Sequence, residues 1–249
     1  MTGKLAWITG ASTGIGRALA LRLARDGWHV AASARGAEAL RTLESEGGGA
    51  IRIYPLDVTD AGAAADVVVE ILRDLGPIDL AVVNAGTHAP TPAEGFDAAV
   101  VRRLVEVNLL GAANTLAAVM PDMIRRKAGQ IAVVASVAGY RGLPLAAAYS
   151  ATKAGLIALA ESLKFDLDRV CVKMQVVNPG FVRTPLTDRN RFPMPFLMEP
   201  EEAVERIVRG LAGSAFEIAF PRRFVWMLKL LGLLPDRLYF PLVARVTGA

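Results

Sequence analysis

The stretch TGASTGIG, residues 9 to 16, begins at the end of an apolar run, LAWIT, and leads into a segment with helical spacing. Gly10, Gly14 and Gly16 lack a Cβ, which permits a tight turn, close approach of the backbone to a pyrophosphate, and close packing of helix on strand. Free N–H groups at the start of that helix would attract phosphate oxygens. The stretch therefore predicts a nucleotide-binding turn between a first strand and a first helix.

Apolar runs bounded by glycine or polar turns recur along the chain, and segments with helical spacing lie between them. They predict seven strands, at residues 5–9, 29–33, 51–54, 78–83, 130–136, 172–177 and 216–220. This alternation is typical of an α/β fold, a doubly wound Rossmann-like parallel sheet with helices on both faces. Its ligand crevice should lie at the carboxyl ends of the strands. Length and the absence of a linker predict one domain over residues 1–249.

Composition narrows the class of protein. Apolar residues make up 53% of the 249 residues and charged ones 21%, which predicts a globular protein with a large core. One cysteine, Cys171, and two histidines, His29 and His88, exclude a disulfide framework and leave little for a metal site. We therefore expect no metal and a reducing, cytoplasmic location.

The two other features of composition concern targeting and charge. The N-terminal residues MTGKLAWITGAS contain no long apolar segment after a basic start, so we expect no secretory signal. The net charge is +4, but basic residues are scattered or in short groups such as Arg125, Arg126 and Lys127. That group suits a helix C-terminus better than a nucleic-acid patch, and we expect no nucleic-acid partner.

Further motifs follow the glycine turn in a set order. They are Asn84-Ala85-Gly86 after the fourth strand, Asn108 in a helix, Ser136 after the fifth strand, Tyr149 with Lys153 four residues on, and NPGFVRTP at 178–185 after the sixth. Together with the GxxxGxG spacing, over residues 4–212, they resemble the short-chain dehydrogenase/reductase family in its classical branch. The resemblance implies a nicotinamide-dependent enzyme that interconverts a ketone or aldehyde and an alcohol, and a homodimer formed through the long middle helices.

The resemblance also implies which residues form the site. The catalytic set is Asn108, Ser136, Tyr149 and Lys153. The cofactor-binding set is Gly10, Ser12, Thr13, Gly14, Ile15, Gly16, Arg35, Asp57, Val58, Asn84, Ala85, Gly86, Tyr149, Lys153, Pro179, Gly180, Val182 and Thr184.

Tyr149 and Lys153 would lie on one face of a helix, because they are four residues apart. A phenol has a pKa of about 10, and a nearby ammonium stabilises its anion. By resemblance, Tyr149 is the general acid that protonates the carbonyl oxygen and Ser136 hydrogen-bonds that oxygen. Lys153 also holds the nicotinamide ribose, and Asn108 orders a water in a proton relay.

Cofactor choice should be decided after the second strand, in AASARG. Ala34 stands where family members that use NAD usually have aspartate, and Arg35 follows. A guanidinium suits a 2′-phosphate, which predicts NADP(H) as the cofactor. The alternative is that Arg35 is only a solvated loop residue, in which case NAD(H) is possible. Asp57 and Val58 match the family's contact to the adenine ring.

Residues 187–198 correspond to the family's substrate lid. Its apolar members, Phe192, Met194, Phe196, Leu197 and Met198, suit a hydrophobic carbonyl compound, although they could equally be ordinary packing under a mobile loop. Pro193 and Pro195 limit regular structure there, and EPEEAVERIV then predicts the start of a helix.

The chain departs from the family over residues 221–249, an apolar C-terminal extension. Phe224, Met227, Leu228 and Leu231 fall at helical spacing, and charged residues and prolines interrupt the segment before it could span a membrane. Three interpretations stay open: packing over the substrate cleft or in a dimer interface, a monotopic membrane contact on the cytoplasmic side, and plain core.

Two other functions compete with reduction of a general hydrophobic ketone or aldehyde. One is reduction of 3-oxoacyl groups or of 3-keto sphingoid bases in lipid synthesis. The other is a non-catalytic nucleotide-sensing or scaffold protein, a class that typically loses the tyrosine or lysine. Both residues are present here.

Overall fold

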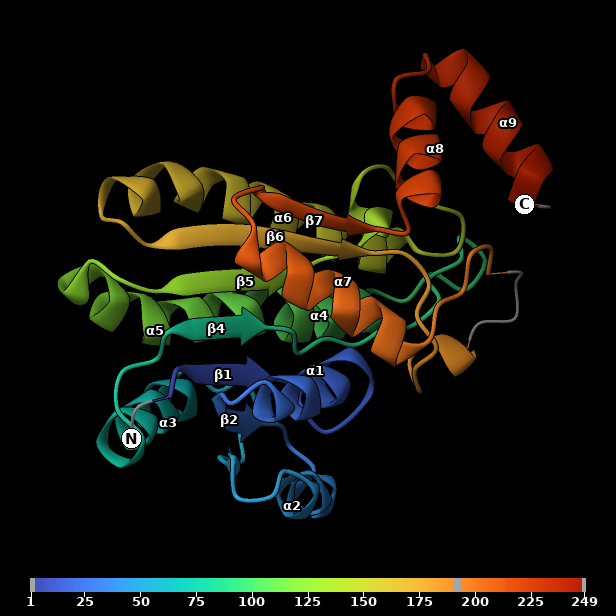
Figure 1. The fold of residues 1–249 in the computed structure, drawn as a ribbon. Helices are drawn as coiled ribbons and strands as arrows, with labels where there is room; N and C mark the ends of the chain where they lie inside the picture. Colours follow the sequence, from blue (N-terminus) through green and yellow to red (C-terminus); the bar gives the residue numbers. More distant parts are fainter. Residues whose placement is uncertain (1–2, 190–193, 248–249) are drawn as a thin grey trace.

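A computed structural model describes residues 3–189 and 194–247. In these residues seven parallel strands form one sheet in the order β3-β2-β1-β4-β5-β6-β7, with helices on both faces (Figure 1). The strands are β1 (Leu5–Thr9), β2 (His29–Ser33), β3 (Ile51–Ile53), β4 (Leu80–Val83), β5 (Gln130–Val134), β6 (Lys173–Pro179) and β7 (Glu217–Phe220). The main helices are α1 (Gly14–Arg25), α2 (Ala37–Glu46), α3 (Ala61–Asp74), α4 (Ala98–Leu104), α5 (Gly111–Arg126), α6 (Ala147–Arg169), α7 (Pro200–Ala212), α8 (Arg222–Gly232) and α9 (Asp236–Thr247).

The predicted fold class is confirmed, and each of the seven predicted strands is present with small differences at its ends. β6 is the largest difference, because it continues through Pro179 and so contains the start of the NPG motif. The glycine run at 47–49 forms a turn before β3, with Gly48 at φ 57° and Gly49 at φ 85°. A left-handed conformation of this kind costs glycine little, which explains the run.

Two apolar layers cover the sheet. On one face, α1, α2 and α7 contribute buried residues such as Leu19, Leu40 and Ile207. On the other, α3, α5 and α6 contribute residues such as Ile71 and Leu116. Strands buried on both faces need apolar side chains throughout, and all five residues of β1 are buried.

The sheet changes winding direction at its centre. β1 pairs with β2 on one side, where Leu5 lies opposite His29, and with β4 on the other, where Ala6 lies opposite Leu80. The chain therefore leaves β1 toward one edge and returns through β4 to build the other. A crevice forms at the carboxyl ends of strands where the order reverses in this way. The loops after β1 and β4 meet there.

The helical run 98–126 is, by length and hydropathy alone, apolar enough to cross a membrane. It consists of α4, a π-helical turn (η1, Val105–Leu110) and α5. Leu116, Val119 and Met123 of α5 are buried against the sheet. Part of the apolar surface of this run therefore belongs to the core of the domain.

The helices α8 and α9 form a hairpin that projects beyond the carboxyl edge of the sheet (Figure 1). Its root is a small apolar cluster of Val137, Phe224 and Val225. Of the residues with predicted helical spacing, Phe224 is buried, whereas Met227 lies on the exposed face. The sequence pattern did not reveal this division because both faces of the helix are apolar.

Candidate active site

A cleft of about 760 Å³ lies at the carboxyl ends of the central strands. It runs from Arg35, after β2, to Ser136, after β5. All of the predicted site residues except Gly16 and Asn108 line it. Motifs that are far apart in the sequence therefore share one cavity, as the winding of the sheet requires.

The glycine turn between β1 and α1 is held in a shape that side chains would prevent. Gly10 has φ 67°, and a Cβ built on it would lie 2.8 Å from Cα of Ala85. A Cβ on Gly16 would lie 2.4 Å from the carbonyl oxygen of Gly10. Gly16 thus lies beneath the cleft and lets α1 begin directly against the turn.

The side chain of Asn84 supports this turn from β4. Its Nδ2 donates to the carbonyl oxygens of Thr9, at 2.9 Å, and Gly10, at 3.2 Å. Its backbone N–H donates to Oγ1 of Thr9 at 3.1 Å. The predicted NAG motif therefore fixes the glycine turn as well as lining the cleft.

The start of α1 leaves its N–H groups open toward the cleft. Thr13 is the N-cap residue in an extended conformation, and its side chain makes no capping hydrogen bond. Thr13, Gly14 and Ile15 all line the cavity. Unsatisfied N–H groups and the positive end of the helix dipole suit a phosphate at this place.

At the far end of the cleft, Arg35 is exposed and its Nη1 lies 4.0 Å from Oδ2 of Asp57. Asp57 accepts hydrogen bonds from the backbone N–H and the hydroxyl of Thr59. These hydrogen bonds, backbone first, outweigh partial burial and, with the charge of Arg35, lower the pKa of Asp57. In the loop after β2, Ala34 is buried and uncharged, whereas Arg35 lines the cleft. The guanidinium of Arg35 is therefore the charged group that this loop presents to the cleft.

Tyr149 and Lys153 lie in the first two turns of α6 and line the opposite end of the cleft. Nζ of Lys153 is 5.7 Å from the centre of the Tyr149 ring and donates to the carbonyl oxygen of Val134 at 2.9 Å. Oγ of Ser136 accepts from the backbone N–H of Ala138 at 3.1 Å. This bond does not use the hydroxyl proton of Ser136, whose side chain also hydrogen-bonds Tyr149.

Burial shifts the pKa values of the two ionisable groups in opposite senses. It raises the pKa of Tyr149, and a hydrogen bond with Ser136 offsets part of that increase. It lowers the pKa of Lys153 to about 8. A tyrosine that keeps its proton at neutral pH can act as an acid, and a nearby negative charge favours the charged form of a buried lysine.

Asn108 lies just behind the cleft in the π-helical turn, and its side chain is fully buried. Its Oδ1 accepts from the N–H of Thr87 at 2.7 Å, and its Nδ2 donates to the carbonyl oxygen of Thr87 and to Oγ1 of Thr152. Asn108 thus joins the loop after β4 to the helix that carries Tyr149. π-helical turns often occur at functional sites.

Sequence reasoning did not identify several residues that shape the site. Thr91 hydrogen-bonds the backbone N–H of Ala148 and so supports the start of α6. His88 packs edge-on against Tyr149, with ring centres 4.8 Å apart. Thr87 and Leu186 line the cleft. Thr87 adjoins the NAG motif, which is a usable signal, whereas no local pattern marks Thr91.

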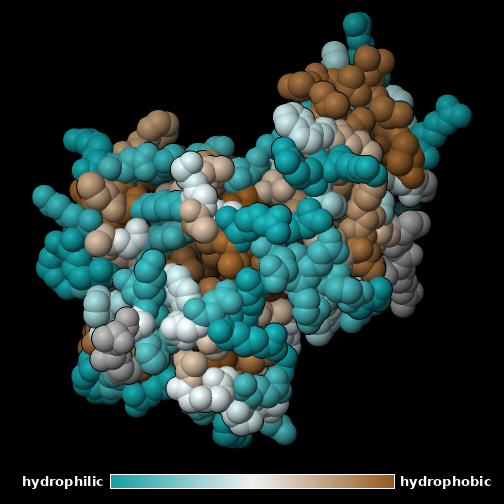
Figure 2. Space-filling view, in the orientation of Figure 1, coloured by the Kyte–Doolittle hydropathy of each residue, from teal (hydrophilic) through white to brown (hydrophobic). Residues whose placement is uncertain are grey.

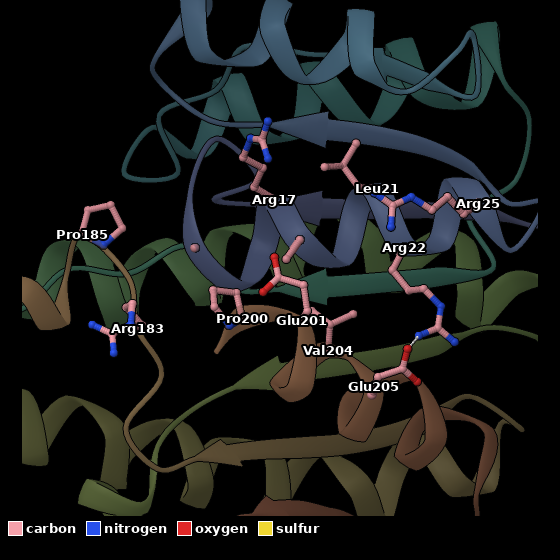
Figure 3. A pocket seen from close by; sticks show the side chains of 12 residues that line it. Arg17, Leu21, Arg22, Arg25, Arg183, Pro185, Pro200, Glu201, Val204 and Glu205 are labelled. Carbon is pink, nitrogen blue, oxygen red and sulfur yellow. Dashed lines mark hydrogen bonds and ion pairs between the residues drawn. The ribbon is translucent and has the colours of Figure 1, made fainter. Parts of the chain in front are cut away.

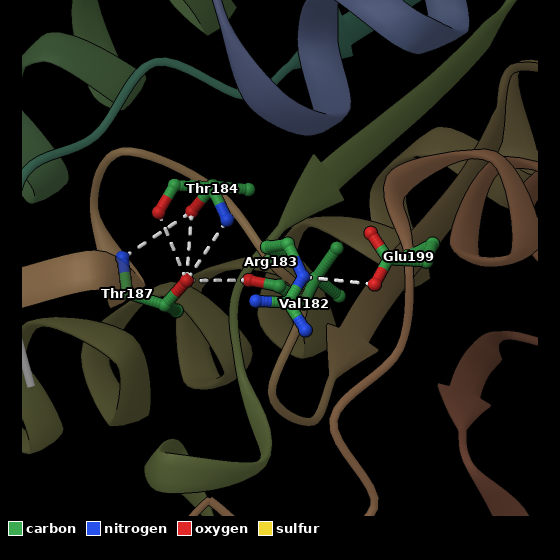
Figure 4. Close-up of polar contacts among 5 residues, drawn as sticks. All are labelled: Val182, Arg183, Thr184, Thr187 and Glu199. Atoms are coloured by element: carbon green, nitrogen blue, oxygen red, sulfur yellow. Dashed lines mark hydrogen bonds and ion pairs between the residues drawn. The ribbon is translucent and has the colours of Figure 1, made fainter.

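The loop after β6 closes on itself beside the cleft (Figure 4). Oγ1 of Thr187 donates to the carbonyl oxygen of Val182 at 2.7 Å, and the N–H of Thr184 donates to Thr187 Oγ1 at 2.9 Å. Arg183 pairs with Glu199 at 2.8 Å. These contacts hold together the two ends of the predicted lid.

Within the predicted lid, Phe192 and Pro193 lie outside the described residues. Met198 is buried in the core layer with α7 and bridges to Val182, so it does not offer a surface to a substrate. Phe196 is half-exposed, with its ring 5.9 Å from that of Phe224. The lid therefore ends against the root of the C-terminal hairpin.

A second hollow, of about 260 Å³, lies between α1 and α7 (Figure 3). Its arginines are largely paired: Arg17 with Glu46, Arg22 with Asp26 and Glu205, and Arg183 with Glu199. It meets the cleft at Gly14 and Pro185. The hollow is a solvated charge network outside the site.

Comparisons with known proteins agree with this geometry. A short chain dehydrogenase family model matches residues 4–193. An uncharacterized oxidoreductase of Myxococcus xanthus is 41% identical, with 96% of each chain covered. A 3-oxoacyl-(acyl-carrier-protein) reductase of Thermotoga maritima is 35% identical, with 88% of each covered. This chain is also similar to the solved structure of an alcohol dehydrogenase from Thermococcus sibiricus complexed with 5-hydroxy-NADP. The two have a TM-score of 0.78 and 30% sequence identity, and the match covers 87% of this chain and 95% of the dehydrogenase.

The fold and these comparisons define an oxidoreductase that acts on alcohol and carbonyl groups with a nicotinamide cofactor. The chain belongs to the short-chain dehydrogenase/reductase family. Among the residues that the structure describes, no cluster of histidine, cysteine, aspartate or glutamate could hold a metal ion.

Proposed function

We propose that the protein is an NADP(H)-dependent oxidoreductase that interconverts a hydrophobic ketone or aldehyde and its alcohol. The observation that carries the proposal is the cleft itself, which has Ser136, Tyr149 and Lys153 at one end and Arg35 at the other. We further propose that residues 1–249 act as one domain and that residues 187–198 close over the substrate.

The residues present fit a dinucleotide. The cradle at Gly10 and Gly16 is one that a Cβ would fill, and the start of α1 offers free N–H groups to a pyrophosphate. Arg35 suits a 2′-phosphate, and Asp57 with Val58 would border the adenine. Pro179, Gly180 and Thr184 line the nicotinamide end of the same cavity. When bound, the reduced cofactor supplies the hydride.

The chain's own residues would manage the proton. Tyr149, whose raised pKa keeps its phenol protonated, would donate to the substrate oxygen as negative charge develops there. Ser136 would donate a second hydrogen bond to the same oxygen. Lys153 would stabilise the phenolate left behind and hold the cofactor ribose. Asn108 would orient this helix and border a water relay, with its side chain engaged by Thr87 and Thr152.

Apolar groups beside the reacting end support a hydrophobic substrate. Leu186 lines the cleft, and Phe196 is half-exposed at the end of the lid. The similarity to the 3-oxoacyl-(acyl-carrier-protein) reductase of Thermotoga maritima supports a second candidate, reduction of 3-oxoacyl groups or of the related 3-keto sphingoid bases. NADPH oxidation followed with simple ketones and aldehydes, 3-oxoacyl thioesters and long-chain 3-keto amines would separate these classes. NADPH binding with no turnover on any of them would favour a nucleotide sensor or scaffold instead.

We also propose a homodimer formed through α5 and α6, in the cytoplasm. Leu110, the last residue of the π-helical turn just before α5, and Phe165, on α6, expose apolar side chains. Exposed apolar residues on adjacent helices suit burial by a second copy.

Replacing Arg35 by aspartate should reverse cofactor preference. A carboxylate repels the 2′-phosphate and can accept hydrogen bonds from the ribose hydroxyls of NAD. We expect the ratio of kcat/KM for NADPH to that for NADH to fall by at least about a hundredfold, since loss of one charged hydrogen bond and gain of repulsion each cost roughly tenfold or more. Arg41→Asp on α2 makes the same change in charge outside the cleft and should leave the ratio unchanged. An unaltered ratio in Arg35→Asp would reject the phosphate assignment.

Burial lowers the pKa of Lys153 to about 8. Affinity for NADPH should therefore fall as the pH rises through this value. Lys153 is charged below this pH and neutral above it, and the anionic cofactor favours the charged form. With one linked proton, the dissociation constant should increase by up to about tenfold per pH unit above 8. Titration by NADPH fluorescence between neutral and alkaline pH measures it. Lys153→Met should bind more weakly and lose this pH dependence; an identical slope in that variant would assign the proton to another group.

A further inference from the structure

The C-terminal hairpin, residues 222–247, exposes apolar side chains to solvent on both of its helices. Trp226 is 60% exposed, Leu230 61% and Leu233 81%, and their spacing puts them on one face of α8 and its end. On α9, Leu238, Leu242 and Val246 follow one another at intervals of four residues and are exposed as well. Figure 2 shows apolar atoms gathered over this lobe, at the upper right of the molecule.

The same surface holds the whole excess of positive charge. Of the 28 basic and 24 acidic residues of the chain, the hairpin contains five and one, so the rest of the chain contains 23 of each. Within the described residues, Arg222, Arg223, Arg237 and Arg245 form no ion pair. Arg222 lies one turn before Trp226, so cations and apolar side chains occupy the same face.

The hairpin is too short to cross a bilayer. α8 has 11 residues and α9 has 12, which correspond to lengths of about 17 and 18 Å against a hydrocarbon core of about 30 Å. An apolar face flanked by arginines instead suits a position in the interface, with the apolar side chains among acyl chains and the guanidinium groups at the headgroups.

A second copy of the chain fits this surface poorly. Two hairpins face to face would bring together two sets of unpaired arginines, and like charges in an interface oppose association. The remainder of the chain has equal numbers of basic and acidic residues and so carries no net negative charge to attract a hairpin. We propose that the hairpin docks the enzyme on the surface of a bilayer that contains anionic lipids.

Docking in this way would bring the substrate end of the cleft to the bilayer. Arg141, in the loop between Ser136 and Tyr149, donates to the carbonyl oxygens of Gly232 and Leu234 and pairs with Asp236. On the other side, the rings of Phe181 and Phe196 pack against Phe224. The hairpin therefore borders both the catalytic loop and the end of the lid, and a carbonyl compound dissolved in the bilayer would have a short path to Tyr149. This last step, unlike docking itself, rests on the proposed function.

Flotation of the full chain with vesicles tests the docking. Vesicles of phosphatidylcholine alone are compared with vesicles that also contain phosphatidylglycerol. We expect the chain to float with the anionic vesicles, to float much less with the neutral ones, and to be released by high salt. The emission of Trp226 should shift to shorter wavelength on binding, because its half-exposed ring leaves water.

Two variants identify the surface. Trp226→Glu with Leu230→Glu should weaken binding by at least about tenfold, and Arg222→Gln with Arg223→Gln by about fivefold for each arginine removed. Val69→Glu is the matched control, since Val69 on α3 is 64% exposed and lies away from the hairpin. It should float as the unmodified chain does. These side chains are exposed, so unchanged circular dichroism is expected for every variant.

Undiminished flotation of the double glutamate variant would overturn the proposal, as would a chain that floats with neither kind of vesicle. The surface is instead covered by a second copy of the chain if two results are found together. The unmodified chain does not float, and the double glutamate variant has half the molecular mass in solution of the unmodified chain. Vesicle binding requires no cofactor or turnover, so failure here is distinguishable from failure of the proposed reaction.

Discussion

Tyr149→Phe is expected to lower kcat at least about a hundredfold, on the scale of general acid catalysis, and to leave NADPH binding nearly unchanged. The change removes one hydroxyl and keeps the ring, including its edge contact with His88. Lys153 is held by a hydrogen bond to the carbonyl oxygen of Val134, with Nζ 5.7 Å from the centre of the Tyr149 ring, so we do not expect it to take the place of the phenol at the substrate oxygen. Ser136 has a hydroxyl, but an alcohol without a base is a poor proton donor. Steady-state kinetics and NADPH titration of the same preparation separate the two effects.

Tyr54→Phe provides the control for loss of a tyrosine hydroxyl. Tyr54 is buried, contacts Asp74 at 3.4 Å and lies outside the cleft. Its replacement should change turnover little. Turnover close to that of the unmodified enzyme in Tyr149→Phe would remove Tyr149 from the role of proton donor, and a parallel loss of NADPH binding would point to a structural role for its hydroxyl.

Gly16→Ala should weaken NADPH binding by at least about tenfold and lower the Tm by several degrees. The added methyl carbon would lie 2.4 Å from the carbonyl oxygen of Gly10 and 2.5 Å from Nδ2 of Asn84. Neither neighbour moves freely, because Asn84 also binds Thr9 and Gly10 is part of the turn. Overpacking of this kind costs roughly 1–3 kcal/mol, partly offset by the higher helix propensity of alanine, about 1 kcal/mol. Displacement of the turn also misplaces the N–H groups at the start of α1.

Gly232→Ala is the matched control for Gly16→Ala. It also lies in a helix, at the end of α8, and no atom approaches within 4 Å of a Cβ built there. Its Tm should be equal to or higher than that of the unmodified chain, and its NADPH affinity should be the same. Equal behaviour of the two alanine variants, by calorimetry and by titration, would contradict the close packing described at Gly16.

The sequence predicted the sheet well because buried parallel strands leave a strong local signal. Runs such as LAWIT are apolar at every position, and the glycine turn after it marks the first crossover. Order along the chain then placed the NAG motif and Ser136 at the same edge of the sheet. The residues proposed for cofactor contact consequently lie around one cleft, with Gly16 just beneath it.

Other features depend on tertiary contacts that no local pattern records. Asn108 reads as an ordinary helical residue, and its π-helical turn and its bonds to Thr87 and Thr152 appear only in the folded chain. Residues 222–247 are apolar on most sides, so periodicity could not say which side packs. The side was decided by the cluster around Val137 and Phe224 and by the contacts of Arg141.

The arrangement around Arg141 has a consequence for biosynthesis. The loop before Tyr149 obtains its contacts from Gly232, Leu234 and Tyr239, whose hydroxyl donates to the carbonyl oxygen of Gly142 at 2.9 Å and whose ring lies 3.7 Å from the Arg141 guanidinium. These partners lie 91 to 97 residues after the loop residues with which they form hydrogen bonds, and a domain folds during synthesis only as far as its contacts have emerged. A nascent chain can assemble the first strands and the glycine turn early, but the catalytic loop obtains these contacts only once residues 232–239 have been made. The reactive end of the cleft is therefore completed later in synthesis than the glycine turn.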